Sequence, residues 1–184
     1  VQMPLKDFTL STTAIVQEVI KQDNRMAVFS KYSLNTVRIV TMLTKNESVI
    51  VLAAIMRCGV GETYVDNVSS GGLGIGVNCK TGQLKKYATD YKGNSYAEHP
   101  SSKVVFEDFI IPEWQSMIAI AIKIQKAFPC YRILGMDIAL SQNGTPVVIE
   151  VNDSPDLLYM ENACEPLLQD KQTLKAFGEY DLFV

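Results

Sequence analysis

Two apolar runs flank an Asn-Gly pair in the stretch from Leu134 to Asp156. Asn-Gly is the preferred centre of a two-residue β-hairpin turn, since both positions of a type I′ turn need a positive φ angle. With Asn143 and Gly144 as the loop, the strand register places Asp137 directly opposite Glu150. Side chains alternate along a strand, so both carboxylates point to the same face of the predicted hairpin.

The two facing carboxylates need a partner, because like charges directly opposite each other destabilise a sheet. Asn152 follows Glu150 on the same face and completes an all-oxygen set with Asp137. Such a set suits Mg²⁺, which binds one or two carboxylates and completes its shell with water and substrate phosphates. The alternative is a solvent-facing hairpin with ordinary surface acids. The apolar residues on both strands favour a central, buried hairpin and therefore a metal site near phosphates.

The composition narrows the class of protein. The chain has 184 residues, 47% hydrophobic and 20% charged, with a net charge of −3, which fits one globular domain or one piece of a larger protein. No basic block indicates nucleic acid or an anionic membrane as a partner, and no run predicts a membrane helix or a signal peptide. The four cysteines are widely spaced, which argues against zinc and favours reduced thiols in a cytoplasmic protein.

A second buried hairpin is predicted from two β-rich runs, residues 36–43 and 48–57, joined by a turn at Lys45-Asn46-Glu47. In this register Arg38 pairs with Ile55, and Arg57 lies diagonally beside Arg38 on the same face. An arginine in a buried sheet needs an anion. A salt bridge to an acid on a neighbouring strand is the structural alternative, but two arginines on one face favour a phosphate or carboxylate site.

The remaining patterns predict an α+β fold. Residues 112–128 carry a wide apolar stripe at helical spacing, with Pro112 and Glu113 suited to the first helical turn. Residues 14–22 fit either a short helix or a strand that leads into a bend. Other expectations are an irregular glycine-rich loop at 58–76, strands on either side of Thr81-Gly82, a polar loop at 90–103 that contains His99, a helix over 161–176 broken at Pro166, and a tail from Phe177.

Six motifs follow one another between residues 14 and 160. They are NTVRIVT (Asn35–Thr41), AAIMRCGVG (Ala53–Gly61), VDNVSSGG (Val65–Gly72), HP (His99-Pro100), IPEW (Ile111–Trp114) and GMDIALSQNGTPVVIEVN (Gly135–Asn152). In this order they resemble the carboxy-terminal lobe of an ATP-grasp enzyme. The closest branch is the sugar-transfer-associated ATP-grasp family, and the glutamate ligases that extend carboxylates with amino acids are more distantly similar.

The resemblance implies roles for the residues singled out above. Asp137, Glu150 and Asn152 match the family's Mg²⁺ ligands. Arg38 and Arg57 match two anion-binding arginines, the first at the phosphates or the acyl phosphate.

Two further segments acquire a role from the resemblance. Asn67 lies in the loop that meets the triphosphate and the acceptor. VQEVI (Val16–Ile20) resembles the hinge whose backbone pairs with the adenine edge, with Glu18 and Ile20 as the backbone contacts. This similarity favours a strand and bend over a helix in that segment.

The resemblance also implies an α+β lobe, with a mostly antiparallel sheet and packed helices. We expect a single lobe over residues 1–184, with an entry segment at 1–13, the nucleotide and metal part at 14–160, and a carboxy-terminal helix and tail at 161–184. Nothing before residue 14 resembles the amino-terminal lobe that closes such sites. These 184 residues alone are therefore expected to lack that lobe and to be inactive.

The implied function is ATP- and Mg²⁺-dependent ligation of a carboxylate to an amine or a sugar-linked acceptor through an acyl phosphate, in polysaccharide or cell-surface sugar biosynthesis. One alternative is a nucleotide-binding module without catalysis. Others are a kinase that uses the same cleft and a globular domain with an incidental acid pair. A homodimer remains open.

Overall fold

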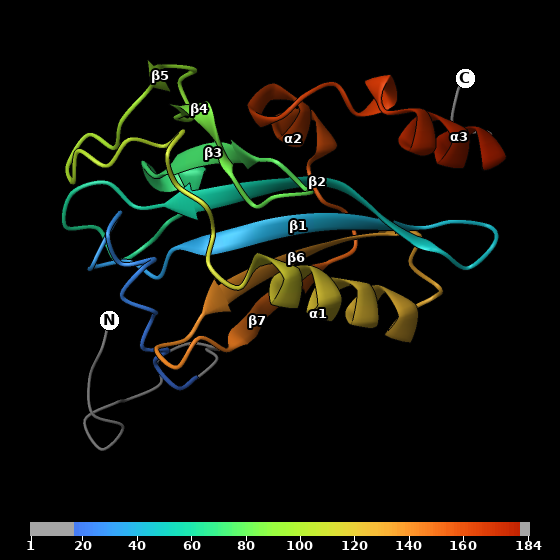
Figure 1. The fold of residues 1–184 in the computed structure, drawn as a ribbon, viewed down its shortest axis with the longest axis horizontal. Coiled ribbons are helices and arrows are strands. Elements are labelled where there is room, and N and C mark those ends of the chain that lie inside the picture. Colours follow the sequence, from blue (N-terminus) through green and yellow to red (C-terminus); the bar gives the residue numbers. More distant parts are fainter. Residues whose placement is uncertain (1–16, 181–184) are drawn as a thin grey trace, which may run out of the picture.

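The computed structural model describes residues 17–180, so the expected entry segment at 1–13 lies outside it. Seven strands form one antiparallel sheet in the order β5-β4-β3-β2-β1-β6-β7, accompanied by three α-helices (Figure 1). The predicted α+β fold is confirmed. The elements are β1 (Thr36–Leu43), β2 (Val49–Cys58), the 3₁₀ turn η2 (Val68–Ser70), β3 (Leu73–Val77), β4 (Leu84–Thr89), β5 (Ser95–Tyr96), α1 (Trp114–Ala127), β6 (Ile133–Leu140), β7 (Pro146–Asn152), α2 (Leu157–Ala163), the 3₁₀ turn η3 (Leu167–Gln169) and α3 (Lys171–Glu179).

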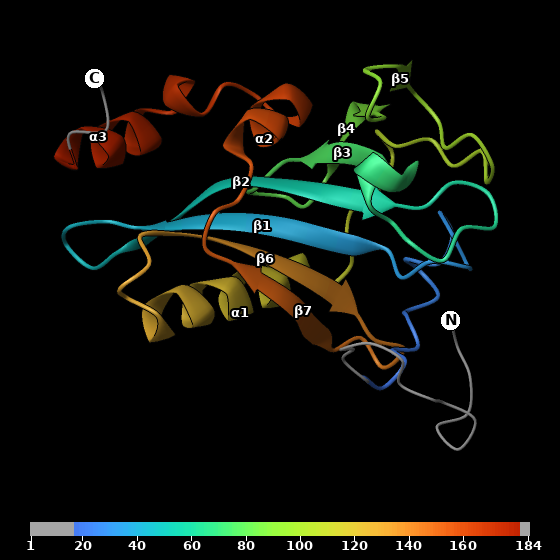
Figure 2. The ribbon, with the colours of Figure 1, turned by 180° about the vertical axis from the view of Figure 1, so that it is seen from behind.

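Helices cover both faces of the sheet, with α1 on one side and α2 and α3 on the other (Figures 1 and 2). Neighbouring residues of a strand point to opposite faces. Ile39 accordingly packs in the cluster that contains Met117 of α1, whereas Val40 packs with Met160 of α2 and Ala176 of α3. The sheet therefore has a separate apolar core on each face.

The β6–β7 hairpin differs from the prediction at its turn. The Ser141 N–H donates to the Thr145 carbonyl at 3.0 Å, so the loop has three residues. Gly144 has a φ of 78°, but Asn143 is not among the described residues with a positive φ. The predicted two-residue type I′ turn is therefore wrong, and the chain uses a longer loop that closes with a left-handed glycine.

A bulge on β7 nevertheless restores the predicted register. Ile138 pairs with Val148 and Asp137 pairs with Glu150, so Ile149 is an extra residue on β7. The longer loop shifts the pairing by one residue, and the bulge shifts it back. Asp137 therefore lies opposite Glu150, as predicted.

The β1–β2 hairpin shows the same compensation. Its turn lies at the predicted residues 45–47, where the Thr44 N–H donates to the Ser48 carbonyl at 2.9 Å and Glu47 has a φ of 62°. An extra residue on β2, Leu52, then restores the predicted pairing of Arg38 with Ile55. In both hairpins the predicted pairing was right at the candidate site positions, and only the turn of the β6–β7 hairpin was wrong.

The β6–β7 hairpin is central only in part. β6 lies between β1 and β7, but β7 is the last strand of the sheet in the described range, and its Glu150 and Val151 are exposed. The prediction of a central hairpin is therefore wrong for β7. Its apolar run has another cause, because Val148 packs on the α1 side and Ile149 is the bulged residue.

α1 begins after the position that Pro112 indicated. Glu113 has a left-handed conformation with a φ of 55°, so it precedes the helix instead of occupying its first turn. The Trp114 indole N–H donates to the Cys79 carbonyl at 3.1 Å, and its side chain packs against Gly82 in the turn between the predicted strands β3 and β4. This docking fixes where α1 starts.

Replacement of Gly82 by alanine should destabilise the fold more than the same change at Gly93. The two glycines have φ angles of 78° and 84°, and a side chain in this region costs about 1–3 kcal/mol. A Cβ at Gly82 would also lie 2.6 Å from a Trp114 ring carbon, whereas one at Gly93 would meet nothing within 4 Å. Urea denaturation should show an additional loss of about 1 kcal/mol or more for Gly82→Ala. Equal losses would contradict the tight docking of Trp114.

The carboxy-terminal helices are interrupted around Pro166, as predicted, but their outer ends differ from the predicted limits at residues 161 and 176. α2 starts before residue 161 because Asp156 caps it, accepting the Tyr159 N–H at 3.0 Å. α3 continues to Glu179, into the predicted tail. In the described part of the 14–22 segment there is no helix, and Gln22 forms an isolated bridge with Ser141.

Candidate functional site

A buried carboxylate between two guanidinium groups lies on the α2 side of the sheet. Asp137 of β6 is 3% exposed. Its Oδ1 accepts the Arg38 Nε–H at 2.7 Å, and its Oδ2 accepts Nη2–H groups of Arg38 and Arg57, each at 2.7 Å. These are short charge-assisted hydrogen bonds, and the Arg38 pair is bidentate.

The strand register explains this arrangement. Arg38 lies opposite Asp137 across the β1–β6 pair, while Thr36 lies opposite Arg57 across the β1–β2 pair. Arg57 is therefore diagonal to Arg38, and both reach Asp137 on one face. The two arginines on a common face are confirmed, and their anion in this structure is the acid on the neighbouring strand.

Two residues that the sequence reasoning missed extend the network. The Thr36 hydroxyl accepts Nε–H and Nη2–H of Arg57 at 3.1 and 2.9 Å. Asp66 Oδ2 accepts both the N–H and the hydroxyl of Thr36. Asn67 Oδ1 accepts the Arg57 Nη1–H at 3.2 Å, so the predicted Asn67 does reach the cluster. The position of Asp66 beside Asn67 in the VDNVSSGG motif was the available signal.

Burial and pairing shift the protonation equilibria in the cluster. The hydrogen bonds with Asp137 raise the pKa of Arg38, which keeps this side chain charged. Burial raises the pKa of Asp66, and the nearby Arg57 opposes that shift. The cluster thus holds permanent positive charge on its arginines beside one acid whose ionised form is disfavoured by desolvation.

Glu150 faces Asp137 across the β6–β7 pair, as predicted, and is exposed. The expected repulsion between these acids is relieved by the arginines on β1 and β2. Asn152 is less available as a metal ligand, because its Oδ1 accepts the Ser154 N–H at 2.8 Å. Within residues 17–180, no cluster of three or more His, Cys, Asp or Glu side chains could hold a metal ion.

The donors nevertheless fit a cation that is held by two carboxylates. A carboxylate offers about four lone-pair sites, and the arginines occupy one on Oδ1 and two on Oδ2 of Asp137. One site on Oδ1 therefore remains for a ligand. Mg²⁺ requires only one or two carboxylates when substrate phosphates complete its shell. Asp137 and Glu150 would hold such an ion, whereas Asn152 would have to break its bond to the Ser154 N–H.

A pocket of about 310 Å³ opens beside this cluster. It lies between the sheet, η2 and α2, with Arg38 and Arg57 on one side and Glu150 at another. The pocket is amphipathic, because Ile55 and Met160 add apolar surface. Its described lining consists of Arg38, Ile55, Arg57, Asn67, Val68, Ser69, Tyr91, Glu150, Asp156, Tyr159 and Met160.

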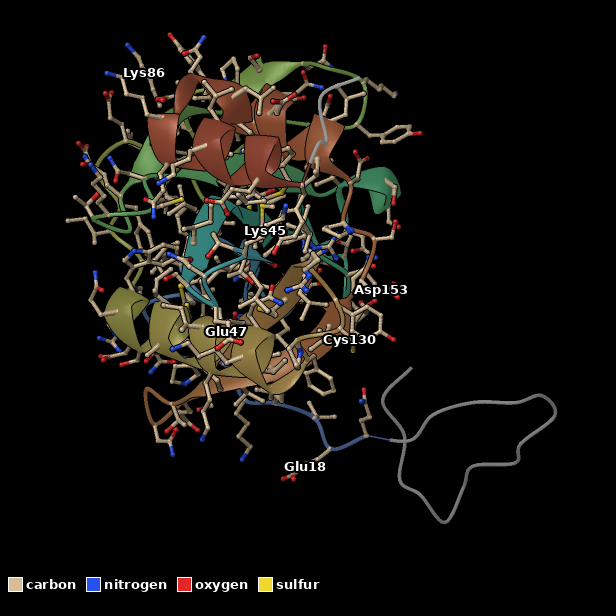
Figure 3. The ribbon with its side chains drawn as sticks, turned by 90° about the vertical axis from the view of Figure 1, so that its right-hand side faces the viewer. Glu18, Lys45, Glu47, Lys86, Cys130 and Asp153 are labelled. Carbon is tan, nitrogen blue, oxygen red and sulfur yellow. The ribbon has the colours of Figure 1, made fainter. Side chains whose placement is uncertain are left out.

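The predicted hinge residues lie elsewhere. Neither Glu18 nor Ile20 is among the described residues that line this pocket. Their segment runs beside the β6–β7 turn, where Gln142 N–H donates to the Lys21 carbonyl at 2.7 Å. In Figure 3 the Glu18 side chain points away from the body of the molecule, at the end opposite α3. Val16 lies outside the described residues.

A larger hollow of about 670 Å³ lies between β2, β3 and the η3–α3 segment. It contains none of the predicted site residues. Its thiols are poor nucleophiles, because burial raises the pKa of Cys79 to about 11 and also raises the pKa of Cys164. The 310 Å³ pocket is therefore the candidate site, since Arg38, Arg57 and Glu150 all line it.

His99 supports the loop that leads toward Asn67. The side chain is fully buried, although the sequence placed it in a polar loop. Its Nε2–H donates to the Gly59 carbonyl at 3.0 Å, while Nδ1 accepts the backbone N–H groups of Ser101 and Ser102. These bonds define a neutral imidazole with the proton on Nε2.

Acidification should expose the role of His99 in stability. Burial lowers the pKa of His99, although the bond to Gly59 partly opposes this shift. Below the ordinary histidine pKa of about 6.5 the unfolded chain binds a proton that the folded chain resists. The free energy of unfolding should therefore decrease as the pH drops from 7 to 5. Urea midpoints should fall less for His99→Gln, and the assignment fails if both proteins lose stability in parallel.

Comparison with known proteins gives one match. The family described as "Sugar-transfer associated ATP-grasp" matches residues 8–177. No curated protein and no solved structure matches the chain. In the part of the chain that the structure describes, no helix has both the length and the apolar character needed to cross a membrane.

Proposed function

Because this chain belongs to the sugar-transfer associated ATP-grasp family, we propose that it provides the nucleotide and metal site of an ATP-dependent ligase. Membership of the family implies that ATP is a ligand. The observation that supports this site is the cluster of Arg38, Arg57 and Asp137 beside Glu150, at the wall of a pocket. The proposal extends to Mg²⁺ as cofactor and to a cytoplasmic location.

The reaction has two transfers. A carboxylate oxygen of the donor attacks the γ-phosphorus of ATP, the bond from that phosphorus to the β-phosphate oxygen breaks, and ADP leaves. An amine or a similar nucleophile then attacks the acyl carbon, the bond from that carbon to the phosphate oxygen breaks, and the nucleophile loses a proton. We propose a sugar-linked acceptor, in keeping with the sugar-transfer association of the family.

The residues of the cluster would act through charge and position. Arg38 and Arg57 would stabilise negative charge on the transferring phosphoryl group with preorganised N–H donors. Asn67 would orient Arg57 at the pocket wall. Asp137 and Glu150 would hold Mg²⁺, which when bound offsets charge on the phosphates. No side-chain base is required in this scheme, because the attacking carboxylate is already ionised and the departing phosphate can accept the proton that the amine loses.

A nucleotide-binding module without catalysis is the second candidate. Its support is that Asp137 already forms ion pairs with both arginines, so the cluster has internal partners without a substrate. A kinase that uses the same pocket would differ in its product, which would retain the phosphate.

Trapping the acyl phosphate tests the proposal. The longest natural form of the protein is incubated with Mg²⁺-ATP, candidate carboxylates and hydroxylamine. A ligase should release ADP and phosphate and form a hydroxamate only when its carboxylate is present. A stable phosphorylated product would instead indicate a kinase. Nucleotide binding without any ADP release would favour the non-catalytic module.

A further inference from the structure

The hydrogen bonds of Asp137 have a consequence for how the pocket can bind ligands. Three guanidinium N–H groups point at this carboxylate, each at 2.7 Å. For Arg38 they are the Nε–H and one Nη2–H, the edge that can bind an anion bidentately. A phosphate that is to be held by this edge of Arg38 must therefore compete with Asp137.

The two arginines are not held equally. Arg57 keeps further partners in Thr36 and Asn67 if its bond to Asp137 is broken. Arg38 has no hydrogen-bond partner other than Asp137 among the residues that the structure describes, and its side chain is 19% exposed at the pocket wall. Arg38 is therefore the group that can turn toward a ligand.

We propose that Asp137 is a switch that couples metal binding to phosphate binding. Without a divalent cation, Asp137 occupies the Nε and Nη2 edge of Arg38. A cation that binds Asp137 and Glu150 weakens this hold, and Arg38 becomes available to a phosphate group. The proposal deepens the proposed function and rests on it for the identity of the two ligands.

Charge balance explains why neither ligand alone is favoured. An anion without a cation meets Glu150 at the rim and must take Arg38 from Asp137. A cation without an anion weakens the bonds between Asp137 and the arginines and leaves their positive charge without a full partner, which is costly. Together the two ligands satisfy every charge in the cluster. The coupling is reciprocal, so each ligand should tighten the other by the same factor.

Metal-free binding of inorganic pyrophosphate tests this switch. The wild-type chain, Asp137→Asn and Glu150→Gln are titrated by calorimetry in the presence of EDTA. Each variant removes one negative charge near the pocket, but only Asp137→Asn frees Arg38 from an ionic bond. Asp137→Asn should bind pyrophosphate about tenfold tighter than wild type, the effect of one charge-assisted hydrogen bond. Glu150→Gln should change the affinity by less than about threefold, the effect of a solvent-screened charge.

A second substitution tests whether Arg38 causes the gain in pyrophosphate affinity. Arg38→Met in the Asp137→Asn background should return the affinity to the wild-type level or below. The switch is overturned if Glu150→Gln strengthens binding as much as Asp137→Asn does, since the effect would then be general electrostatics. It is also overturned if Asp137→Asn binds no tighter than wild type.

Chemical modification of the wild-type protein covers the case in which Asp137→Asn does not fold. Phenylglyoxal reacts with accessible guanidinium groups, and peptide mass spectrometry reads each arginine separately. Millimolar Mg²⁺ should accelerate the modification of Arg38 but not that of the surface residue Arg25, and added pyrophosphate should protect Arg38. An Arg38 rate that Mg²⁺ leaves unchanged contradicts the switch. If Mg²⁺ accelerates the modification of Arg38 but no hydroxamate forms in the trapping experiment, the switch is supported and the ligase function is rejected.

Discussion

The double variant Asp137→Asn, Glu150→Gln should lose Mg²⁺-dependent binding of ATP. These two carboxylates face each other across the β6–β7 pair and are the only acids that we assign to the cation. Amides keep the shape of both side chains but remove the charge that holds a divalent ion. A fluorescent ATP analogue, titrated with and without EDTA, should show a loss of about a hundredfold or more in the Mg²⁺-dependent affinity.

A matched pair of changes controls for the loss of two charges. Glu107 and Asp153 are exposed acids outside the pocket, and Glu107→Gln with Asp153→Asn changes the net charge by the same amount. This control should bind Mg²⁺-ATP as the wild type does. Tight Mg²⁺-dependent binding by the Asp137 and Glu150 variant would remove both residues from the site.

Arg57→Met should cause the largest loss of stability among the single changes discussed. The Arg57 side chain is 10% exposed and bonds to Asp137, Thr36 and Asn67. Its removal weakens the charge compensation of Asp137 and takes away the cation 3.8 Å from Asp66. Breaking a buried ion pair from one side costs about 3–5 kcal/mol. Urea denaturation should therefore show a loss of at least about 3 kcal/mol.

The control for this loss is another arginine in an ion pair. Arg25 bonds to Asp23 at 2.8 Å, but its own side chain is 52% exposed. Arg25→Met should cost much less than Arg57→Met, as expected for a solvent-exposed pair. If the two variants lose similar stability, the cluster around Asp137 is not the strong internal constraint described above.

The sequence supported the predictions that depend on alternation along strands. The facing pair Asp137 and Glu150 and the common face of Arg38 and Arg57 follow from period-two geometry and an approximate turn position. The turn types did not follow, because Asn-Gly also fits a three-residue loop with only Gly144 left-handed. The bulges escaped prediction as well, since they depend on how each strand packs on its neighbours.

The composition of the site was harder to predict because it depends on tertiary contacts. The repulsion between the facing acids of the β6–β7 hairpin suggested a cation between them, but guanidinium groups from β1 and β2 already bond to Asp137. Asp66 and Tyr159 reach the cluster and the pocket from segments with no shared periodicity. The assignment of Glu18 as an adenine contact stays a prediction, because the structure does not bring it to the pocket.

The most direct test of this account follows the Nε–H signals of Arg38 and Arg57 by ¹⁵N NMR during titration with Mg²⁺-ADP. Lysine variants assign the two signals. The account predicts a saturable change at Arg38, which loses its bond to Asp137, and a smaller change at Arg57, whose Nε–H stays on Thr36. In the variant without the two carboxylates, the response of the Arg38 signal to ADP should be the same with and without Mg²⁺. A wild-type Arg38 signal that saturating Mg²⁺-ADP leaves in place would contradict the account.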